Sequence, residues 1–435
     1  MDKYFHSVTL DADRCLGCTN CIKRCPTEAI RVRDGKASII SERCIDCGEC
    51  IRICPHHAKR PVYDSLSLLK NYKYNIAIPA PSLYGQFSNL DDIDIVLTGL
   101  KGLGFDDVVE VAAAAELVSD ATRLYMHDKN IKKPVISSAC PAIVRLIRVR
   151  FPDLCENVLP LKAPMEIAAQ VARRKAAQEH PEFSEDEVGV FFISPCAAKV
   201  TDVKSPIGAD SSSVSGVLAI SAIFAELASQ MTKVKTPEPL SESGIIGVSW
   251  AGIGGESSAL LREQYLAADG IENVIRVLEG LEDEKFTDLD FIELNACAGG
   301  CLGGVLTVEN PYVARARLKR LRKYLPVSCA HMEEKEIPDD MKWTEELEFV
   351  PVMELSGDLG KAMEMMGQID EISAKLPGLD CGSCGAPSCR CLAEDIVRGE
   401  ADITDCVFIL RERVQTAASA LSSIGMINHN GKEGE

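Results

Sequence analysis

Residues 188–199 read VGVFFISPCAAK, an apolar run of strand length that ends at Cys196. Two more apolar runs end in the same way, VISSAC at Cys140 and FIELNAC at Cys297. In α/β sheets the carboxyl ends of parallel strands open into the ligand crevice, so these thiols are expected to converge on one site. Cys301 follows four residues after Cys297 among glycines, which let the backbone approach a bulky group closely. A single buried cysteine more often packs as a small hydrophobe, but four in this pattern indicate a ligand set.

The chain around these cysteines alternates between strand and helix patterns. Strand-length apolar runs occupy residues 75–79, 107–111, 134–136, 188–193, 244–248 and 289–294, and helical patterns occupy 91–100, 112–127, 164–178, 221–231 and 313–325. Strands that alternate with helices predict an α/β domain with mostly parallel, covered sheets.

Composition limits the function classes. The 435 residues suffice for two or three domains, and the formal charge of −18 argues against a nucleic-acid-binding protein, which needs a basic face. The N-terminus carries no export signal and no apolar stretch is long enough to cross a bilayer, so we expect a cytoplasmic protein without a membrane partner. In a reducing compartment the 19 cysteines are more often metal ligands or redox groups than disulfides.

An internal duplication occupies the N-terminal region. CLGCTNCIKRCP (15–26) and CIDCGECIRICP (44–55) both follow the spacing C-x2-C-x2-C-x3-C-P. In this spacing three cysteines hold one 4Fe-4S cluster and the fourth reaches the other cluster. The predicted ligand sets are Cys15, Cys18, Cys21 and Cys54 for one cluster, and Cys44, Cys47, Cys50 and Cys25 for the other. Zinc sites or structural thiols are the alternatives, and the complete repeats disfavour both. The segment resembles bacterial two-cluster ferredoxins, which have an α+β fold and transfer electrons.

A third cysteine group lies near the C-terminus. LDCGSCGAPSCRCLAEDIVRGEADITDC (379–406) places Cys381, Cys384, Cys389 and Cys406 around an expected helix at 390–399. The pattern resembles a small 4Fe-4S domain of anaerobic redox proteins. Zinc suits four thiolates equally well, but the other clusters favour iron and sulfur. Cys391 could replace Cys389, although its spacing fits less well.

SACPAIVRL (138–146), SPCAAK (194–199) and NACAGGCLGG (295–304) resemble the three signature segments of FeFe-hydrogenases, and the resemblance covers about residues 1–310. It implies a two-lobed α/β catalytic domain around an H-cluster, a 4Fe-4S cubane joined to a diiron unit that carries CO, cyanide and a dithiolate. Cys140, Cys196, Cys297 and Cys301 would hold the cubane, with Cys301 as the bridge. Lys199 matches a lysine that pairs with a cyanide, and Ala80, Pro81 and Ser82 of IPAPS match a segment near the other cyanide. A surface lysine is the alternative for Lys199.

The chain departs from the family's proton relay. Ala139 replaces the proton-passing cysteine, Leu159 a serine and Ala113 the inner glutamate, whereas Glu116 retains the outer one. Loss of a positioned acid or base commonly lowers the rate by about 10²–10⁴-fold. Glu116 could equally be a helix-surface acid. Ser194 and Asn295 stand where the family has pocket methionines, and polar groups there can retune a cluster.

These losses resemble sensory FeFe-hydrogenases. The resemblance implies slow, reversible conversion of hydrogen and protons, electron relay through 4Fe-4S clusters to a redox or signalling partner, and maturation proteins that deliver the diiron unit. A bulk hydrogen producer with another proton path and a non-catalytic iron–sulfur assembly protein are the alternatives. The expected domains are a ferredoxin-like domain at 1–62, an H-cluster domain at 63–345, a C-terminal 4Fe-4S domain with an acidic linker at 346–425, and a disordered tail at 426–435. Cys155, Cys329 and Cys391 are expected to be packing or surface thiols.

Overall fold

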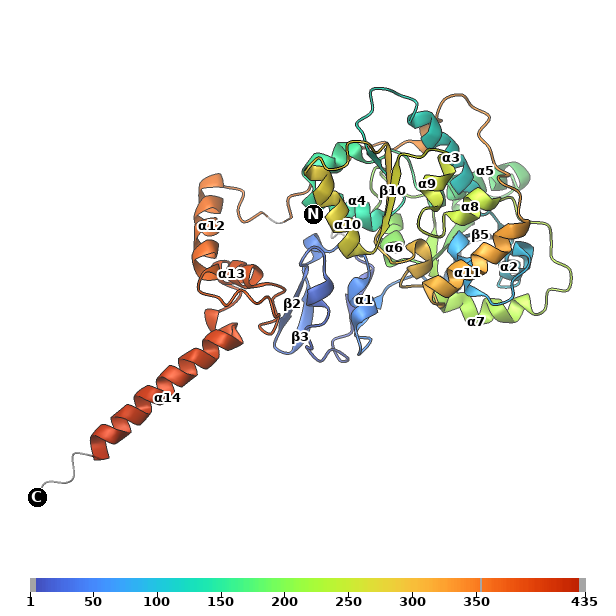
Figure 1. The fold of residues 1–435 in the computed structure, drawn as a ribbon. Helices are drawn as coiled ribbons and strands as arrows, with labels where there is room; N and C mark the ends of the chain where they lie inside the picture. The colour runs from blue at the N-terminus through green and yellow to red at the C-terminus, as the bar shows by residue number, and fades with distance from the viewer. Residues whose placement is uncertain (1–4, 353, 430–435) are drawn as a thin grey trace, which may run out of the picture. The chain divides into compact units, whose positions relative to one another are not determined.

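The computed structural model describes residues 5–352 and 354–429, with 423–429 as backbone alone. Backbone contacts divide the chain into two units (Figure 1). The first comprises Met1–Thr9, Ile45–Arg52 and Arg60–Pro351, and the second Leu10–Cys44, Ile53–Lys59 and Val352–Glu435. Strands β1 (Val8–Leu10) and β4 (Lys59–Pro61) and helix α1 (Glu49–Ile53) cross the division.

The first unit contains two parallel sheets. One has the order β6-β5-β8-β9, formed by β5 (Tyr74–Pro79), β6 (Asp107–Val108), β8 (Val188–Ser194) and β9 (Gly216–Ala219). The other has the order β10-β11-β7, formed by β7 (Val135–Ile136), β10 (Tyr265–Asp269) and β11 (Phe291–Asn295). All their pairings are parallel, and every residue of β8 is buried, as expected for a sheet covered on both faces.

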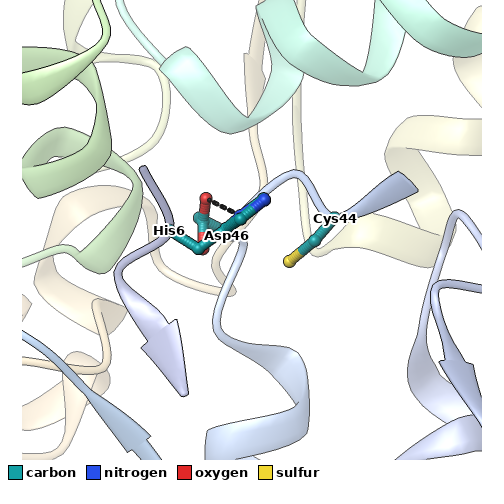
Figure 2. A group of neighbouring side chains, drawn as sticks. All are labelled: His6, Cys44 and Asp46. Carbon is teal, nitrogen blue, oxygen red and sulfur yellow. Dashed lines mark hydrogen bonds and ion pairs between the residues drawn. The ribbon is translucent and has the colours of Figure 1, made fainter. Parts of the chain in front are cut away.

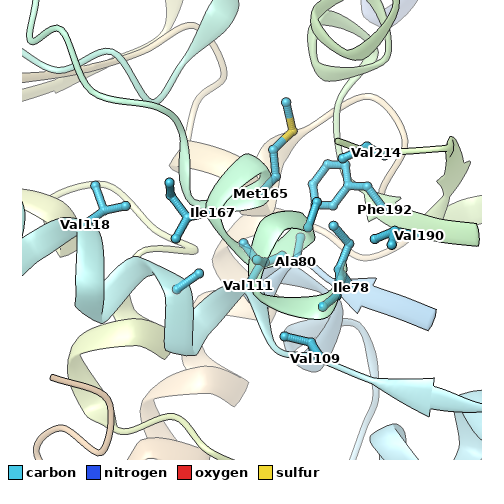
Figure 3. Close-up of a cluster of buried hydrophobic side chains, with 14 of the residues drawn as sticks. Ile78, Ala80, Val109, Val111, Val118, Met165, Ile167, Val190, Phe192 and Val214 are labelled. Atoms are coloured by element: carbon cyan, nitrogen blue, oxygen red, sulfur yellow. The ribbon is translucent and has the colours of Figure 1, made fainter. Parts of the chain in front are cut away.

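Helices cover both sheets. They are α2 (Ile93–Lys101), α3 (Val111–Tyr125), α4 (Pro141–Arg150), α5 (Pro164–Glu179), α6 (Ala197–Lys204), α7 (Ile220–Met231), α8 (Ile245–Ser249), α9 (Gly255–Ala259), α10 (Ile271–Glu282) and α11 (Pro311–Leu321). Figure 3 shows one core cluster, in which Ile78 of β5 and Phe192 of β8 pack with Val118 of α3 and Ile167 of α5. This burial of apolar side chains holds the strand ends, and the loops that follow them, in fixed positions.

The second unit combines a β-hairpin with helices. Strand β2 (Ile30–Arg33) pairs antiparallel with β3 (Lys36–Ile39), and the C-terminal part contributes α12 (Leu359–Ser373), α13 (Cys389–Val397) and α14 (Val407–His429). Among the helices of the described residues, none has the length and apolar character needed to span a lipid bilayer.

The predicted α/β class with mostly parallel sheets is confirmed, and the two sheets correspond to two lobes. The predicted strand at 244–248 is wrong, because this apolar run forms α8. A short apolar run has no periodicity that separates strand from helix, and here the Glu116 carboxylate accepts hydrogen bonds from the amides of Gly244 and Gly247 at 2.8 and 3.1 Å. The expected strand at 107–111 ends at Val108, before α3 begins.

The sequence patterns did not predict several elements, among them β9, β10, α4, α6 and α10. The prediction of a disordered tail at 426–435 is wrong for residues 426–429, which continue α14. Residues 430–435 lie outside the described part of the chain.

Candidate metal centre

Four cysteines of the first unit lie beyond the carboxyl ends of its strands. Cys140 follows β7 and directly precedes α4, and Cys196 follows β8 and directly precedes α6. Cys297 follows β11, and Cys301 lies in the 3-10 helix Gly300–Gly303. The strand-end pattern in the sequence therefore brings these residues to the same edge of the fold, as predicted.

Glycines let the loop that carries Cys297 and Cys301 approach its neighbours. Gly299 and Gly300 have positive φ values of 85° and 72°. A Cβ atom on Gly304 would lie 2.0 Å from the carbonyl oxygen of Pro195, directly before Cys196. Only glycine permits this contact, which holds the Cys301 loop against the Cys196 turn.

The four thiols act on one another electrostatically. Burial raises the pKa of Cys301 to about 12; Lys199 opposes this rise, and Cys196 and Cys140 add to it. Burial likewise raises the pKa of Cys297 well above its usual value, with further rises from Cys196 and Cys140. Buried thiolates this close together need a compensating positive charge, which an iron–sulfur core supplies by binding them. The donor set thus fits a cluster.

A pocket adjoins Cys301, which is one of its lining residues. Its lining is largely apolar and includes Ala80, Pro81, Ser82, Val111, Ala115, Ala139, Phe192, Lys199, Trp250, Glu256, Glu293, Asn295 and Cys301. The pocket therefore unites the predicted IPAPS segment, Lys199 and Ala139 with one of the four cysteines.

Two hydrogen-bond donors point to a polar occupant. Ser82 is fully buried, and among the described residues its hydroxyl has no partner. Lys199 is only 8% exposed, so the surface alternative is wrong, and its Nζ donates to the carbonyl of Ala139 at 3.1 Å. A buried unpaired hydroxyl and a buried ammonium are costly in an apolar pocket unless a ligand accepts from them. Two cyanides of an H-cluster satisfy this requirement, so the residues fit that group.

Ser194 supports the turn that carries Cys196, whereas Asn295 faces the pocket. The fully buried Ser194 hydroxyl donates to the carbonyl of Cys196 at 3.0 Å and accepts from its amide at 3.1 Å, so it braces the cysteine turn. Asn295 lines the pocket, and its Nδ2 donates to Glu293 at 3.1 Å.

A pair of buried carboxyl groups, which the sequence reasoning missed, shares the pocket. Glu256 of α9 is 5% exposed and Glu293 of β11 is 2% exposed. The Ser137 hydroxyl donates to Glu256 at 2.7 Å. Glu293 accepts from the amides of Gly254 and Ser257, both at 2.9 Å, as well as from Asn295. The only sequence signal was one acidic residue within the buried strand FIELN.

Burial, reinforced by the nearby Glu293 carboxylate, raises the pKa of Glu256 to about 8. Burial also raises the pKa of Glu293, but its backbone and side-chain donors oppose the rise. Because Glu293 has more donors, the ionised form is better stabilised there, and Glu256 is the protonated member at neutral pH.

Within the described part of the chain, the remaining positions of the expected relay form no connected path. Ala113 and Leu159 are buried side chains without an ionisable group. Glu116 is 1% exposed, so its interpretation as a helix-surface acid is wrong. Besides the two amides of α8, its carboxylate accepts from the amides of Cys329 and Ala330 at 2.8 Å. Glu116 therefore joins α3, α8 and the 328–330 segment.

Part of the second N-terminal cysteine repeat packs against the candidate centre. Cys47 and Cys50 belong to the first unit. A Cβ on Gly48 would lie 2.8 Å from Val305, and the Arg52 guanidinium donates to the carbonyl of Gly303 at 2.8 Å. This places the Cys47–Cys50 loop next to the loop that carries Cys301.

The cysteines of the second unit include those of the C-terminal motif and most of the N-terminal repeats: Cys15, Cys18, Cys21, Cys25, Cys44, Cys54, Cys381, Cys384, Cys389, Cys391 and Cys406. The C-terminal loop packs directly on β2. The Val32 amide donates to the carbonyl of Gly385 at 2.8 Å, and a Cβ on Gly385 would lie 1.8 Å from the Val32 oxygen. The Arg33 guanidinium donates to the carbonyl of Cys384 at 2.7 Å.

Buried ion pairs strengthen this contact. Arg31 donates from Nε to both carboxylate oxygens of Asp395 at 2.8 and 3.0 Å, and the two side chains are 6% and 4% exposed. Arg33 joins the same carboxylate at 2.7 Å, and Arg43 pairs with Glu394 at 2.6 Å. The ferredoxin-like hairpin and the C-terminal cysteine motif thus form one packed body.

Cys391 differs from Cys389. Cys391 is 2% exposed within a hydrophobic cluster, and its pKa is raised to about 12 by burial and by Glu28. Cys389, like Cys381 and Cys384, is only partly buried. Cys389 stays the predicted ligand of the C-terminal set, and Cys391 the predicted packing thiol. Of the other spare thiols, Cys155 is buried and Cys329 is exposed.

His6 and Asp46 form a separate polar contact in the first unit. Nδ1 of His6 lies 3.0 Å from the Asp46 carboxylate, which also accepts from the amide of Val8 at 3.0 Å (Figure 2, which also draws Cys44). The contact fixes the segment before β1 to the turn that precedes Cys47.

Comparison with known families matches three parts of the chain. Residues 73–267 match the family described as "Iron only hydrogenase large subunit, C-terminal domain". Residues 7–55 match a 4Fe-4S dicluster domain, and residues 376–408 match an Fe-S cluster family. The central part of the chain is therefore similar to FeFe-hydrogenases, and it is flanked by a segment similar to a ferredoxin-like dicluster domain and by a segment similar to an iron–sulfur cluster family.

Curated relatives agree with this assignment. The chain is 26% identical over 382 residues to iron hydrogenase 1 of Clostridium pasteurianum, a match that covers 70% of this chain and 65% of the relative. It is 26% identical over 366 residues to the periplasmic Fe hydrogenase large subunit of Nitratidesulfovibrio vulgaris, covering 69% and 86%. It is 24% identical over 345 residues to the NADP-reducing hydrogenase subunit HndD of Solidesulfovibrio fructosivorans, covering 67% and 55%. The chain thus spans about two thirds or less of the length of the first and third relatives.

Solved FeFe-hydrogenase structures also match. One described by its stepwise H-cluster assembly has 16% identity and a TM-score of 0.45, covering 60% of this chain and 89% of its own. The FeFe-hydrogenase HydA1 from Chlamydomonas reinhardtii has 17% identity and a TM-score of 0.45, covering 60% and 90%.

Proposed function

We propose that the chain is a hydrogenase that holds an H-cluster and catalyses the reversible reaction H2 ⇌ 2H+ + 2e−. The observation that carries this proposal is the combination of four partly or fully buried cysteines, which affect one another's pKa, with an adjoining pocket that contains the Lys199 ammonium and the unpartnered Ser82 hydroxyl. Cys140, Cys196, Cys297 and Cys301 would hold the cubane, and Cys301, which lines the pocket, would also bridge to the diiron unit. When bound, the H-cluster supplies the iron site and the amine base at which hydrogen is split.

The pocket residues orient the cofactor. Lys199 and Ser82 supply a positive charge and a hydroxyl for the two cyanides, while Ala80 and Pro81 shape the wall beside Ser82. Charge-assisted hydrogen bonds in a dry pocket are stronger than in water, so these two donors select an anionic ligand.

The buried carboxyl pair handles protons in place of the missing relay. Ala139 cannot exchange a proton, but Glu256 and Glu293 line the same pocket. Glu256 holds its proton with a pKa of about 8, close to neutral pH, as a general acid or base requires. Asn295 and Ser137 position the two carboxyl groups through single hydrogen bonds.

Electrons travel through the 4Fe-4S clusters. The cluster set of Cys44, Cys47, Cys50 and Cys25 would be the neighbour of the H-cluster, because the Cys47–Cys50 loop packs on Gly303 and Val305. In the second unit, the set of Cys381, Cys384, Cys389 and Cys406 packs against β2 and against Ile22, the residue after Cys21. The C-terminal cluster is therefore proposed to exchange electrons with the cluster of Cys15, Cys18, Cys21 and Cys54 and then with a redox or signalling partner.

A sensory role with slow turnover is the finer proposal. It rests on the absence of ionisable groups at Ala139, Ala113 and Leu159, and on a carboxyl pair enclosed by protein. Such a protein would convert the hydrogen level in the cytoplasm into the redox state of its clusters. It would depend on maturation proteins for the diiron unit, as the H-cluster does in the family it resembles.

Infrared spectroscopy of the anaerobically matured protein tests the proposal. Bands of bound CO and cyanide, together with hydrogen turnover, are expected. Intact cubanes without these bands after maturation would instead identify a non-catalytic iron–sulfur protein. If the bands are present and turnover is as fast as that of ferredoxin-linked hydrogenases, the proposed reaction stands and the sensory role is refuted.

A further inference from the structure

Helix α14 has an exposed apolar seam. Large side chains at Val407, Leu410, Val414 and Leu421 are 43%, 47%, 59% and 70% exposed. Together with the exposed Ala417 they follow the spacing 3-4-3-4, which keeps all five on one side of the helix. Exposure of these apolar side chains to water along one face of the helix is unfavourable, so the seam is expected to be covered by another protein surface.

The spacing of the apolar residues also indicates which kind of structure can pack against the seam. Apolar residues every 3.5 residues on average pack knobs into holes against another helix with the same repeat. Val407, Val414 and Leu421 take a positions and Leu410 and Ala417 take d positions, and the β-branched a residues with leucine at d in the first heptad favour a parallel pair. We propose that α14 pairs with α14 of a second copy of this chain in a parallel two-stranded coiled coil.

Charge permits this pairing in an otherwise acidic protein. The chain carries a net charge of −18, yet residues 414–429 contain no Asp, Glu, Lys or Arg. In a parallel pair Arg413 at a g position faces Ala418 at the e position of the second copy, so no like charges meet across the seam. Two copies can thus approach along the part of the chain where repulsion is weakest.

The seam begins beside the C-terminal cysteine motif. The Leu410 amide donates to the carbonyl of Cys406 at 2.9 Å, and Ile409 packs into the hydrophobic cluster of that motif. The first turn of α14 is therefore anchored on the motif by one side, while Val407 and Leu410 remain exposed on another. Pairing would hold the C-terminal motifs of two copies at the same end of the coiled coil.

Sedimentation of the full chain, with its cubanes reconstituted anaerobically, tests the proposal over a range of concentrations. The wild-type protein is expected to approach twice its 47.2 kDa mass as concentration rises. Val414→Glu, at an exposed position, should shift the dissociation constant upward by at least about 100-fold, because it places two like charges at facing a positions. Gln415→Glu, on the polar side of the helix, adds the same charge and should leave the mass unchanged.

A mixture of two oppositely charged variants shows whether the dimer forms through this seam or through another surface. Val414→Lys alone should be monomeric, and an equal mixture of Val414→Lys and Val414→Glu should form a dimer, because a parallel pair brings residue 414 of both copies together. A monomeric wild-type protein at all concentrations, a dimer that survives Val414→Glu, or a mixture that stays monomeric would each overturn the proposal. Iron content and helical circular dichroism equal to wild type exclude misfolding of the variants.

Discussion

Glu256→Gln is the perturbation that tests the proposed proton chemistry most directly. Glutamine keeps the size of the side chain and can still accept the hydrogen bond from Ser137, but it cannot ionise. The substitution therefore removes the proton of the buried pair while it leaves the four cysteines and Lys199 in place.

The magnitude follows from the pKa. Burial, reinforced by Glu293, raises the pKa of Glu256 from 4.5 to about 8. A shift of about 3.5 units corresponds to about 5 kcal/mol against the ionised form, and at pH 7 only about a tenth of the molecules carry that charge. The raised pKa means that the contribution of this group to folding stability is complete below about pH 4.5 and is lost as the pH rises through about 8.

Hydrogen evolution measured against pH is the assay. The protonated form is the donor, so the wild-type rate should fall as the pH rises through about 8. Glu256→Gln should lower the rate by about 10²–10³-fold and remove the inflection, while the CO and cyanide bands persist. Glu226→Gln, an exposed position on α7, is the matched control and should behave as wild type. A Glu256→Gln protein with the wild-type rate and the same inflection would refute the assignment.

Four further substitutions test other parts of the protein. Lys199→Met should keep the cubanes but lose most of the CO and cyanide intensity, because the ammonium is the buried cation of the pocket; full intensity would contradict its role. Cys389→Ser should remove about four iron atoms per chain and Cys391→Ala should remove none, and iron analysis with the reverse result would reassign the ligand. Arg31→Ala should destabilise the second unit by about 1.5–3 kcal/mol, because the buried Asp395 loses the hydrogen bonds from Arg31 Nε and keeps only Arg33; protease resistance equal to wild type would show that the pair is dispensable.

Local spacing in the sequence predicts part of the fold and of the site. The cysteines of each repeat and of the C-terminal motif lie within short loops, and strands β5, β7, β8 and β11 consist mostly of apolar residues, so the sequence alone is enough to locate these elements. Lys199 is predictable in the same way because it lies three residues after Cys196, within the first turn of α6.

Contacts between distant residues could not be predicted. Glu256 and Glu293 meet in one pocket only because α9 packs beside β11, and neither lies in a cysteine motif. The pair of Arg31 and Asp395 joins residues 364 positions apart. The apolar run 244–248 becomes a helix because Glu116, more than 120 residues earlier, accepts its amide hydrogen bonds. Tertiary context decides such cases, and it outweighs local pattern.

The buried carboxyl pair of Glu256 and Glu293 offers a physical reason why a protein without the usual proton relay would turn over slowly. A proton carrier with a pKa near the ambient pH exchanges readily, but exchange also requires a continuous path of donors and acceptors. Glu293 is engaged by several fixed donors and Glu256 by Ser137, and the old relay positions Ala113 and Leu159 offer neither donor nor acceptor side chains. Proton supply to the pocket then limits the rate, whereas the equilibrium between hydrogen, protons and reduced clusters is unaffected by how slowly it is reached. A protein built in this way reports the hydrogen level through its cluster redox state and consumes little hydrogen while doing so.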